Sequence, residues 1–198
     1  ILLLWKEILQ KISHSKLLLK SSIFSNEDGV KQIIARLTKL GFDLEKIEFR
    51  GESVNYLAEY NEVDIALDTY PYVGGGTTCE ALYMGTPVIT LVGDRPGARF
   101  GYSILKNLGL DDCIAASKAE YIEKAVALAT NIARLTYLHD NLRRMMGISP
   151  LMNSVSYMKN IEAVEEAKTW QGTPYHHQGR VKGVGVDCGT LICEVYEK

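Results

Sequence analysis

The sequence has no apolar run long enough to cross a membrane. Its most apolar end, residues 1–4, is followed at once by Trp5, Lys6 and Glu7, whereas a membrane-spanning helix needs about 20 apolar residues. A signal-peptide cleavage pattern is also lacking. We therefore expect no membrane element. Because the first residue is Ile rather than Met, we also expect the chain to be part of a longer protein.

Neither sign of charge is in excess. The 22 lysines and arginines nearly balance the 24 aspartates and glutamates, which gives a formal net charge of −2. The sequence thus lacks the basic field that attracts nucleic acid or an anionic membrane surface. We expect neither among its partners.

Cysteine is scarce, and its spacing is not that of a metal site. Cys79, Cys113, Cys188 and Cys193 contain no C-x-x-C pair and no second cluster that would complete a zinc tetrahedron. We expect reduced thiols, a cytoplasmic location and no bound metal. With 46% hydrophobic and 23% charged residues, the chain has enough apolar material for one good core and a small appendage.

Helical and strand-like patterns alternate along most of the chain. The alternation favours right-handed β-α-β crossovers, and so an α/β fold with a Rossmann-like parallel sheet and helices on both faces. Ligands of such sheets bind beyond the carboxyl ends of the strands, which directs attention to the loops after Leu67 and Val92. Strands are predicted at residues 16–20, 47–50, 63–67 and 87–92, and helices at 2–12, 26–40, 53–60 (capped by Ser53), from 77 onward, 100–108, 118–130 and 131–146.

A glycine-rich loop after the third predicted strand is the most informative segment. Gly74, Gly75 and Gly76 remove every Cβ where the backbone bends, and Thr77 then opens a helix whose first N–H groups have no partner within the helix. Helix amino termini of this kind attract anions. We expect a diphosphate to accept hydrogen bonds from these amides and from the Thr77 and Thr78 hydroxyls.

Glu80, three residues after Thr77, has two readings. Its carboxylate can accept hydrogen bonds from the diol of a ribose. The same Thr-x-x-Glu spacing also forms a capping box, which needs no ligand. The spacing alone does not distinguish the ribose contact from the capping box. For Tyr70 and Tyr72, packing of the loop is favoured over stacking on a base.

The segment around this loop resembles the donor site of the O-linked N-acetylglucosamine transferase (SPINDLY-like) family. Residues 64–72 read Asp-Ile-Ala-Leu-Asp-Thr-Tyr-Pro-Tyr, and residues 74–91 read Gly-Gly-Gly-Thr-Thr-Cys-Glu-Ala-Leu-Tyr-Met-Gly-Thr-Pro-Val-Ile-Thr-Leu. The resemblance covers about three quarters of the chain. Shorter similar stretches lie at residues 17–20, 47–51, 60–64, 93–95, 99, 107–110 and 149–151.

The resemblance implies a GT-B glycosyltransferase, of which residues 1–160 are the second, nucleotide-sugar-binding lobe. It implies inverting transfer of N-acetylglucosamine from UDP-GlcNAc to Ser or Thr of a protein acceptor, without a metal or other cofactor. It also implies that the phosphates of the donor contact residues 75–78, with Gly74 next to them, and that the ribose contacts Glu80. The family's basic residues, its other lobe and the helical repeats that present the acceptor all precede this segment.

The sequence departs from the family at three positions of the donor site. Val73 stands where the family commonly has Asn, Gly76 where it has Thr, and Tyr56 close to where it has His. We expect at least one side-chain hydrogen bond to the donor to be absent. A catalytically inactive remnant that binds the nucleotide through its backbone is therefore an alternative reading.

Residues 161–198 differ in character and resemble the start of an NlpC/P60 cell-wall peptidase of the phage type. A Gly-Thr-Pro-Tyr loop precedes an Asp-Cys pair, as in that family, where the cysteine is the nucleophile. The resemblance implies that Cys188 is catalytic at a helix amino terminus, which favours the thiolate. A small buried side chain is the competing reading. We expect an incomplete appendage, with the joint at residues 157–168 and too little chain for a core of its own.

Overall fold

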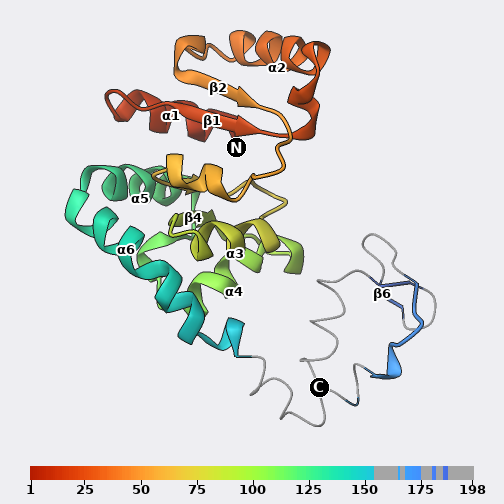
Figure 1. Ribbon diagram of the computed structural model, residues 1–198. Helices are drawn as coiled ribbons and strands as arrows, with labels where there is room; N and C mark the ends of the chain where they lie inside the picture. Colours follow the sequence, from red (N-terminus) through yellow and green to blue (C-terminus); the bar gives the residue numbers. More distant parts are fainter. Residues whose placement is uncertain (154–164, 166–167, 175–179, 182–184, 187–198) are drawn as a thin grey trace. The chain divides into compact units, whose positions relative to one another are not determined.

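The computed structural model describes residues 1–153, 165, 168–174, 180–181 and 185–186. The chain forms two compact units, Ile1–Gly147 and Ile148–Lys198, and the first carries the predicted α/β fold (Figure 1). The predicted boundary near residue 160 lies in a stretch outside the described residues, so it stays a prediction. Cys188 lies outside the described residues as well. Of the segment from the Gly-Thr-Pro-Tyr loop to the Asp-Cys pair, the structure describes residues 172–174, 180–181 and 185–186.

Helices and strands alternate in the first unit in the predicted order. Helix α5 has the predicted bounds, and β4 is buried at all four positions, as its β-branched sequence indicates. The elements are α1 (Leu2–Lys11), β1 (Leu17–Lys20), η1 (Ser22–Ser25), α2 (Glu27–Lys39), η2 (Leu44–Lys46), β2 (Ile47–Arg50), η3 (Ala58–Glu62), β3 (Ala66–Leu67), α3 (Gly76–Tyr83), β4 (Val88–Leu91), η4 (Pro96–Ala98), α4 (Phe100–Asn107), η5 (Asp111–Cys113), β5 (Ile114–Ala115), α5 (Lys118–Thr130) and α6 (Ile132–Ile148).

All strand pairs of the first unit are parallel, but the strands form two sheets. One sheet pairs β1 with β2, with Leu17 opposite Ile47, and the other has the order β3-β4-β5. A cavity of about 780 Å³ is lined by residues of both β1 and β3. Strands β1 and β3 therefore do not pair with each other. The single sheet that the sequence predicts is divided into two.

The core joins the two layers through α1 and α5. Trp5, on α1, donates a hydrogen bond of 3.1 Å from its indole nitrogen to the Tyr121 hydroxyl on α5. Tyr121 in turn donates to the backbone oxygen of Asp68 at 2.9 Å. All three residues are buried. The first helix is thus tied by two buried hydrogen bonds to the residue that directly follows β3.

One sequence interpretation is wrong in detail. Ser53 does not cap a helix: its hydroxyl donates to Glu59, and the helical turn begins only at Ala58. The helix predicted at residues 26–40 is confirmed as α2, and Gly41 follows it with a φ of +73° that favours glycine. On α6, the Nε2 of His139 lies 3.0 Å from the backbone oxygen of Asp64.

In the second unit the structure describes the 3-10 turn η6 (Pro150–Met152) and a short antiparallel pair, β6 (Arg180–Val181) with β7 (Gly185–Val186). Within the part of the chain that the structure describes, no helix is both long and apolar enough to span a bilayer. Cys79 and Cys113 are free thiols.

Candidate functional site

The glycine-rich loop lies at the carboxyl end of β3, where ligands of parallel sheets bind. Strand β3 ends at Leu67, the loop follows from Asp68, and α3 begins at Gly76. Tyr70 packs against the core, as predicted, whereas Tyr72 is 67% exposed and does not. The predicted phosphate-binding residues therefore lie together at one edge of the β3-β4-β5 sheet.

Asp68 fixes the shape of this loop. One carboxylate oxygen accepts a hydrogen bond of 2.7 Å from the Gly74 amide, and the other accepts one of 2.7 Å from the Thr90 hydroxyl on β4. Burial raises the pKa of the Asp68 carboxyl, while the hydrogen bonds from Gly74, Thr90 and Thr69 act in the opposite direction. A buried carboxylate thus ties the glycine loop to the neighbouring strand.

Asp68 was not among the predicted site residues, although its place in the sequence carries a signal. An aspartate directly after a strand, six residues before a glycine run, is well placed to accept amide hydrogen bonds from that loop. Thr90 gave no such signal, because its β-branched side chain fits a buried strand without any polar partner.

The three glycines of the loop have different surroundings. A Cβ on Gly74 would lie 2.6 Å from the hydroxyl oxygens of both Thr77 and Thr78, whereas a Cβ on Gly75 or Gly76 would meet nothing within 4 Å. Close packing therefore demands glycine at residue 74. At residues 75 and 76 the space in front of the backbone is open.

Replacing Gly74 with alanine should lower the free energy of unfolding by about 1–3 kcal/mol, the usual cost of overpacking. The new methyl group would push the Thr77 and Thr78 side chains aside. Urea denaturation followed by circular dichroism measures the effect, and Gly75→Ala is the matched control because its methyl group has room. Equal midpoints for the two variants would contradict this account of the loop.

The amino terminus of α3 presents unpaired amides beside a small crevice. Among the described residues, the amides of Gly76, Thr77 and Thr78 have no hydrogen-bond acceptor, and the N-cap residue, Gly75, supplies no side chain. A cavity of about 180 Å³ next to them is lined by Thr77, Thr78, Gly74, Asp68 and Tyr60, among others. This geometry suits an anion, because the amides and the helix dipole both favour negative charge.

Glu80 is not part of a capping box. Helix α3 begins at Gly76, which places Thr77 inside the first turn rather than at the N-cap. The Glu80 carboxylate instead accepts a hydrogen bond of 2.9 Å from the Tyr56 hydroxyl. This bond raises the pKa of the Tyr56 phenol above its ordinary value. Glu80 therefore has a side-chain partner outside its own helix.

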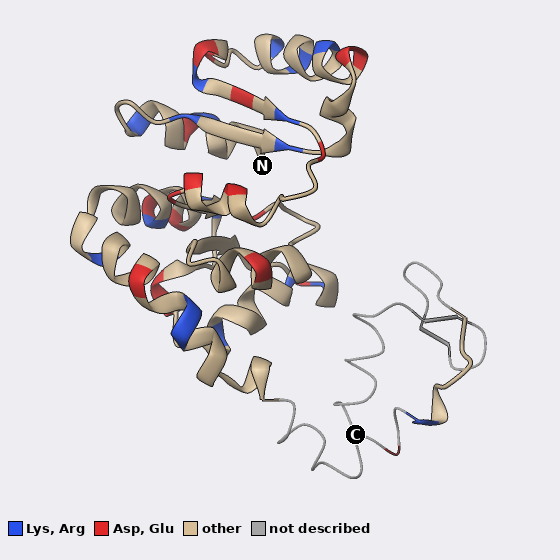
Figure 2. Cartoon of the chain, in the orientation of Figure 1, with Lys and Arg blue, Asp and Glu red and all other residues tan. Residues whose placement is uncertain are grey.

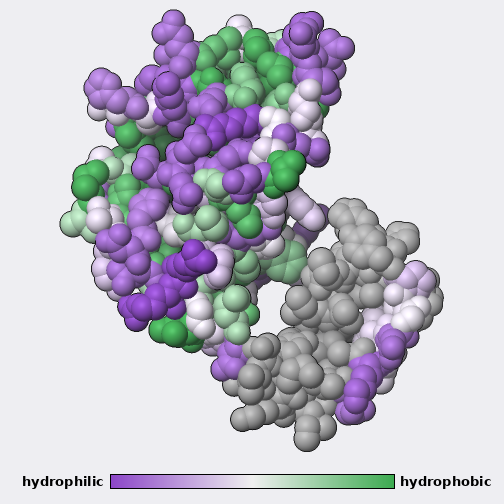
Figure 3. All heavy atoms as spheres, in the orientation of Figure 1, coloured by the Kyte–Doolittle hydropathy of each residue, from purple (hydrophilic) through white to green (hydrophobic). Residues whose placement is uncertain are grey.

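Ion pairs hold the segment that carries Tyr56 and Tyr60. Lys20, at the end of β1, lies 2.8 Å from Glu59, and Arg50, at the end of β2, lies 2.6 Å from Glu62. Figure 2 shows these basic strand ends beside the acidic residues of η3. On the face shown in Figure 3, hydrophilic side chains gather around this region. The pairs fix η3 between the β1–β2 layer and α3.

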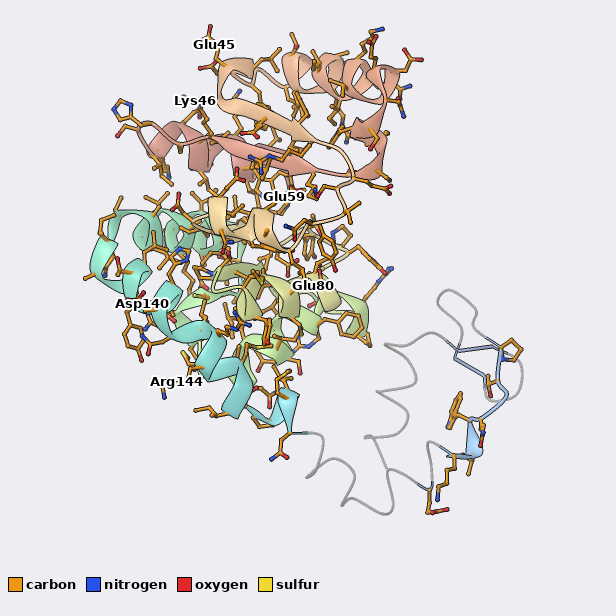
Figure 4. All side chains as sticks on the ribbon, in the orientation of Figure 1. Glu45, Lys46, Glu59, Glu80, Asp140 and Arg144 are labelled. Atoms are coloured by element: carbon orange, nitrogen blue, oxygen red, sulfur yellow. The ribbon has the colours of Figure 1, made fainter. Side chains whose placement is uncertain are left out.

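Two tyrosines of this segment reach α3. Tyr56 contacts Glu80, as described, and the Tyr60 hydroxyl lies 3.4 Å from the backbone oxygen of Thr77. Figure 4 shows Glu80 on α3 and Glu59 on the neighbouring η3. Tyr56 stood out in the sequence only as a departure from the family, and Tyr60 was not predicted as a site residue. Of the two tyrosines, Tyr60 lines the crevice, together with Thr77 and Thr78.

The loop after β4 is the second one that the topology singles out. Arg99 donates a hydrogen bond of 3.1 Å to the backbone oxygen of Gly93, and its guanidinium lies 4.8 Å from the centre of the Tyr102 ring. These contacts occupy Arg99 in shaping its own loop. The glycine loop before α3 is thus the stronger candidate for ligand binding.

Known proteins are similar to this chain in sequence and in structure. Over 167 residues the chain is 34% identical to the probable UDP-N-acetylglucosamine–peptide N-acetylglucosaminyltransferase SPINDLY of Solanum lycopersicum, and over 166 residues it is 31% identical to that of Arabidopsis thaliana. These alignments cover 83% and 82% of this chain. The structure also resembles an O-GlcNAc transferase mutant of Thermobaculum terrenum, with a TM-score of 0.73 and 30% identity over 80% of this chain. The expected GT-B lobe is therefore confirmed.

The match covers only part of each relative. The chain spans 18% of the length of the two plant proteins and 32% of the Thermobaculum chain. The sequence profile of glycosyl transferase family 41 matches residues 1–161. The match includes the glycine loop and α3 and ends at residue 161, where the segment predicted to resemble a peptidase begins. The chain belongs to glycosyl transferase family 41.

Proposed function

We propose that residues 1–160 are the donor-binding lobe of a protein O-GlcNAc transferase. In this proposal UDP-N-acetylglucosamine is the donor, and the acceptor is a Ser or Thr hydroxyl of a protein that the rest of the enzyme presents. The observation that carries the proposal is that the amides of Gly76, Thr77 and Thr78 have no acceptor among the described residues, and that Thr77 and Thr78 line an open crevice at the carboxyl end of β3.

The chemistry that this lobe supplies is stabilisation of the leaving group. When the acceptor hydroxyl attacks the anomeric carbon, its proton passes to a base outside this lobe, the bond to the diphosphate breaks and negative charge grows on the departing UDP. Amides already aimed at the phosphate offset this charge without having to reorganise. The Thr77 hydroxyl, which is exposed beside them, adds a further donor. The mechanism proposed for this lobe uses no metal or other cofactor.

The proposal predicts saturable binding of UDP that depends on α3. Thr77→Ala and Glu80→Ala should each weaken UDP binding by about tenfold, because each removes a hydrogen bond that involves a charged partner. Calorimetric titration of the 198-residue chain with UDP, UDP-GlcNAc and GDP-fucose measures this and also identifies the donor. Thr136→Ala, at an exposed position on α6, is the matched control. Absence of any UDP binding by the unaltered chain would refute the proposal.

The peptidase reading of Cys188 stays a prediction. Cys188 is outside the described residues, and the family match ends at residue 161. A cytoplasmic location likewise stays a proposal, based on the expected reduced state of the cysteines. No observation favours the peptidase over the transferase.

A further inference from the structure

The contact between Tyr56 and Glu80 joins two segments that are 24 residues apart in the chain. The Tyr56 hydroxyl donates to one carboxylate oxygen of Glu80 at 2.9 Å, and the tyrosine side chain is 40% exposed. Because so much of the Tyr56 side chain is exposed, burial of its ring contributes little to holding it in this position. Its position is instead determined by the hydrogen bond to Glu80 and by the backbone that the η3 ion pairs hold.

Glu80 lies on the same face of α3 as the anion-binding end. Residues three and four positions apart share a helix face, so Glu80 follows Thr77 and Gly76 along one side of α3. Thr77 belongs both to this side and to the lining of the crevice. A nucleoside diphosphate with its phosphates on the amides of Gly76 and Thr77 would extend along this face. Its ribose diol would then compete for the carboxylate that Tyr56 occupies.

We propose that Tyr56 is a latch on the donor site: its hydroxyl holds one carboxylate oxygen of Glu80 in the free protein and must release it before both hydroxyls of a ribose diol bind the carboxylate. The inference rests on the proposed function, because it takes the crevice to bind a nucleoside diphosphate. Tyr56 is a positioning residue, since it acts through Glu80. The latch sets how much the ribose contributes to affinity, and it leaves the phosphate contacts unaffected.

The surrounding groups fit a latch that opens. Tyr60, the next tyrosine of the segment, bonds to the backbone of Thr77 rather than to Glu80, so it does not replace Tyr56 on the carboxylate. The ion pairs of Glu59 and Glu62 hold η3 whether or not Tyr56 contacts Glu80. Rotation of one side chain therefore frees Glu80 without disturbing the fold.

Removing the latch hydroxyl should tighten the binding of a ribose-containing ligand. We expect Tyr56→Phe to bind UDP about three- to tenfold more tightly than the unaltered chain, because the diol no longer displaces a hydrogen bond to a charged group. Inorganic pyrophosphate and 2′,3′-dideoxyuridine diphosphate, which have no diol, should bind both proteins equally. Calorimetric titration of the full chain measures all three ligands. Tyr137→Phe, an exposed tyrosine on α6, is the control and should change nothing.

Titration of the Tyr56 phenol gives a readout that needs no ligand. The carboxylate at residue 80 raises the pKa of Tyr56 above its ordinary value of 10.0, so Glu80→Gln should return it toward that value. Tyrosine ring carbon signals in NMR, assigned by comparison with Tyr56→Phe, follow this change. An unaltered Tyr56 titration in Glu80→Gln would show that the contact does not exist in solution and would overturn the proposal.

The ligand series separates the latch from the proposed function. If the unaltered chain binds UDP but Tyr56→Phe binds it equally or more weakly, the latch is wrong and the donor site stands. If the gain in Tyr56→Phe extends to pyrophosphate, the hydroxyl acts on the phosphates and the latch is again wrong. If neither protein binds UDP or pyrophosphate, the donor site itself is refuted, and the latch with it.

Discussion

Replacing Gly75 with aspartate should lower the affinity for UDP by about a hundredfold, or roughly 2.7 kcal/mol, while the fold keeps its stability. Gly75 is the N-cap residue of α3, and its side-chain position opens onto free space. An aspartate there accepts hydrogen bonds from the amides of Thr77 or Thr78, as N-cap aspartates do. The new carboxylate would therefore occupy the amides that we propose bind phosphate, and it would repel a diphosphate by its charge.

The stability of the same variant should remain equal or rise by a few tenths of a kcal/mol, because aspartate is a better N-cap than glycine. Opposite effects on binding and on stability distinguish a blocked site from a damaged fold. Gly75→Asn is the matched control: it occupies the amides without adding charge, so its loss of affinity should be about tenfold. Calorimetry and urea denaturation measure the two quantities. Undiminished UDP binding by Gly75→Asp would place the phosphate elsewhere.

Replacing Asp68 with alanine should lower the free energy of unfolding by about 3 kcal/mol. Two donors, the Gly74 amide and the buried Thr90 hydroxyl, would lose their acceptor, at about 1–3 kcal/mol for a buried unsatisfied group. Packing around this carboxylate is close: a Cβ on Gly101, the second residue of α4, would lie 2.6 Å from an oxygen of Asp68. Alanine would therefore leave a gap lined by polar groups, which adds to the loss of stability.

Asp68→Asn tests the same contacts with a side chain of nearly equal size. Its amide oxygen still accepts one hydrogen bond, and the cost of burying a charge disappears, so the loss should be about 1 kcal/mol. Urea denaturation followed by circular dichroism compares the variants. If asparagine were as destabilising as alanine, the second acceptor oxygen and the charge of Asp68, rather than its size, would explain its role. A loss of less than about 1 kcal/mol in Asp68→Ala would contradict the assignment.

Local patterns predicted the elements of the first unit well. The apolar face from Lys118 to Thr130 and the β-branched run of β4 depend only on neighbouring residues, and both elements lie where the sequence placed them. The end of α2 was equally clear, because Gly41 supplies the positive φ that stops a helix. For these elements the secondary structure follows from periodicity and from single punctuating residues.

Contacts between distant segments could not be predicted in the same way. The bond between Tyr56 and Glu80 depends on how η3 is held above α3, which in turn depends on Lys20 and Arg50 at the ends of two other strands. The Thr-x-x-Glu spacing left a capping box open, and the structure decides against it because the N-cap of α3 is Gly75 rather than Thr77. A shift of two residues at a helix start thus changed the role of Glu80.

The division of the sheet is a second feature that no local pattern contains. Strands β1 and β3 each have a clear apolar sequence, but nothing in either run specifies its neighbour. Residue types predicted an anion site at the glycine loop, whereas the anchor of the loop at Asp68 and the positions of Tyr56 and Tyr60 required the three-dimensional arrangement. The predicted site residues themselves await the binding measurements described above.

The hydrogen bonds from Trp5 through Tyr121 to Asp68 make the first helix part of the foundation of the donor site. Shortening the protein at its amino end by only five residues would leave every ligand-facing group in place. It would nevertheless strip the Tyr121 hydroxyl of its donor and weaken the support of the glycine loop from behind. Any version of this lobe trimmed for expression should therefore retain the indole of Trp5, although that residue lies far from the glycine loop in the sequence.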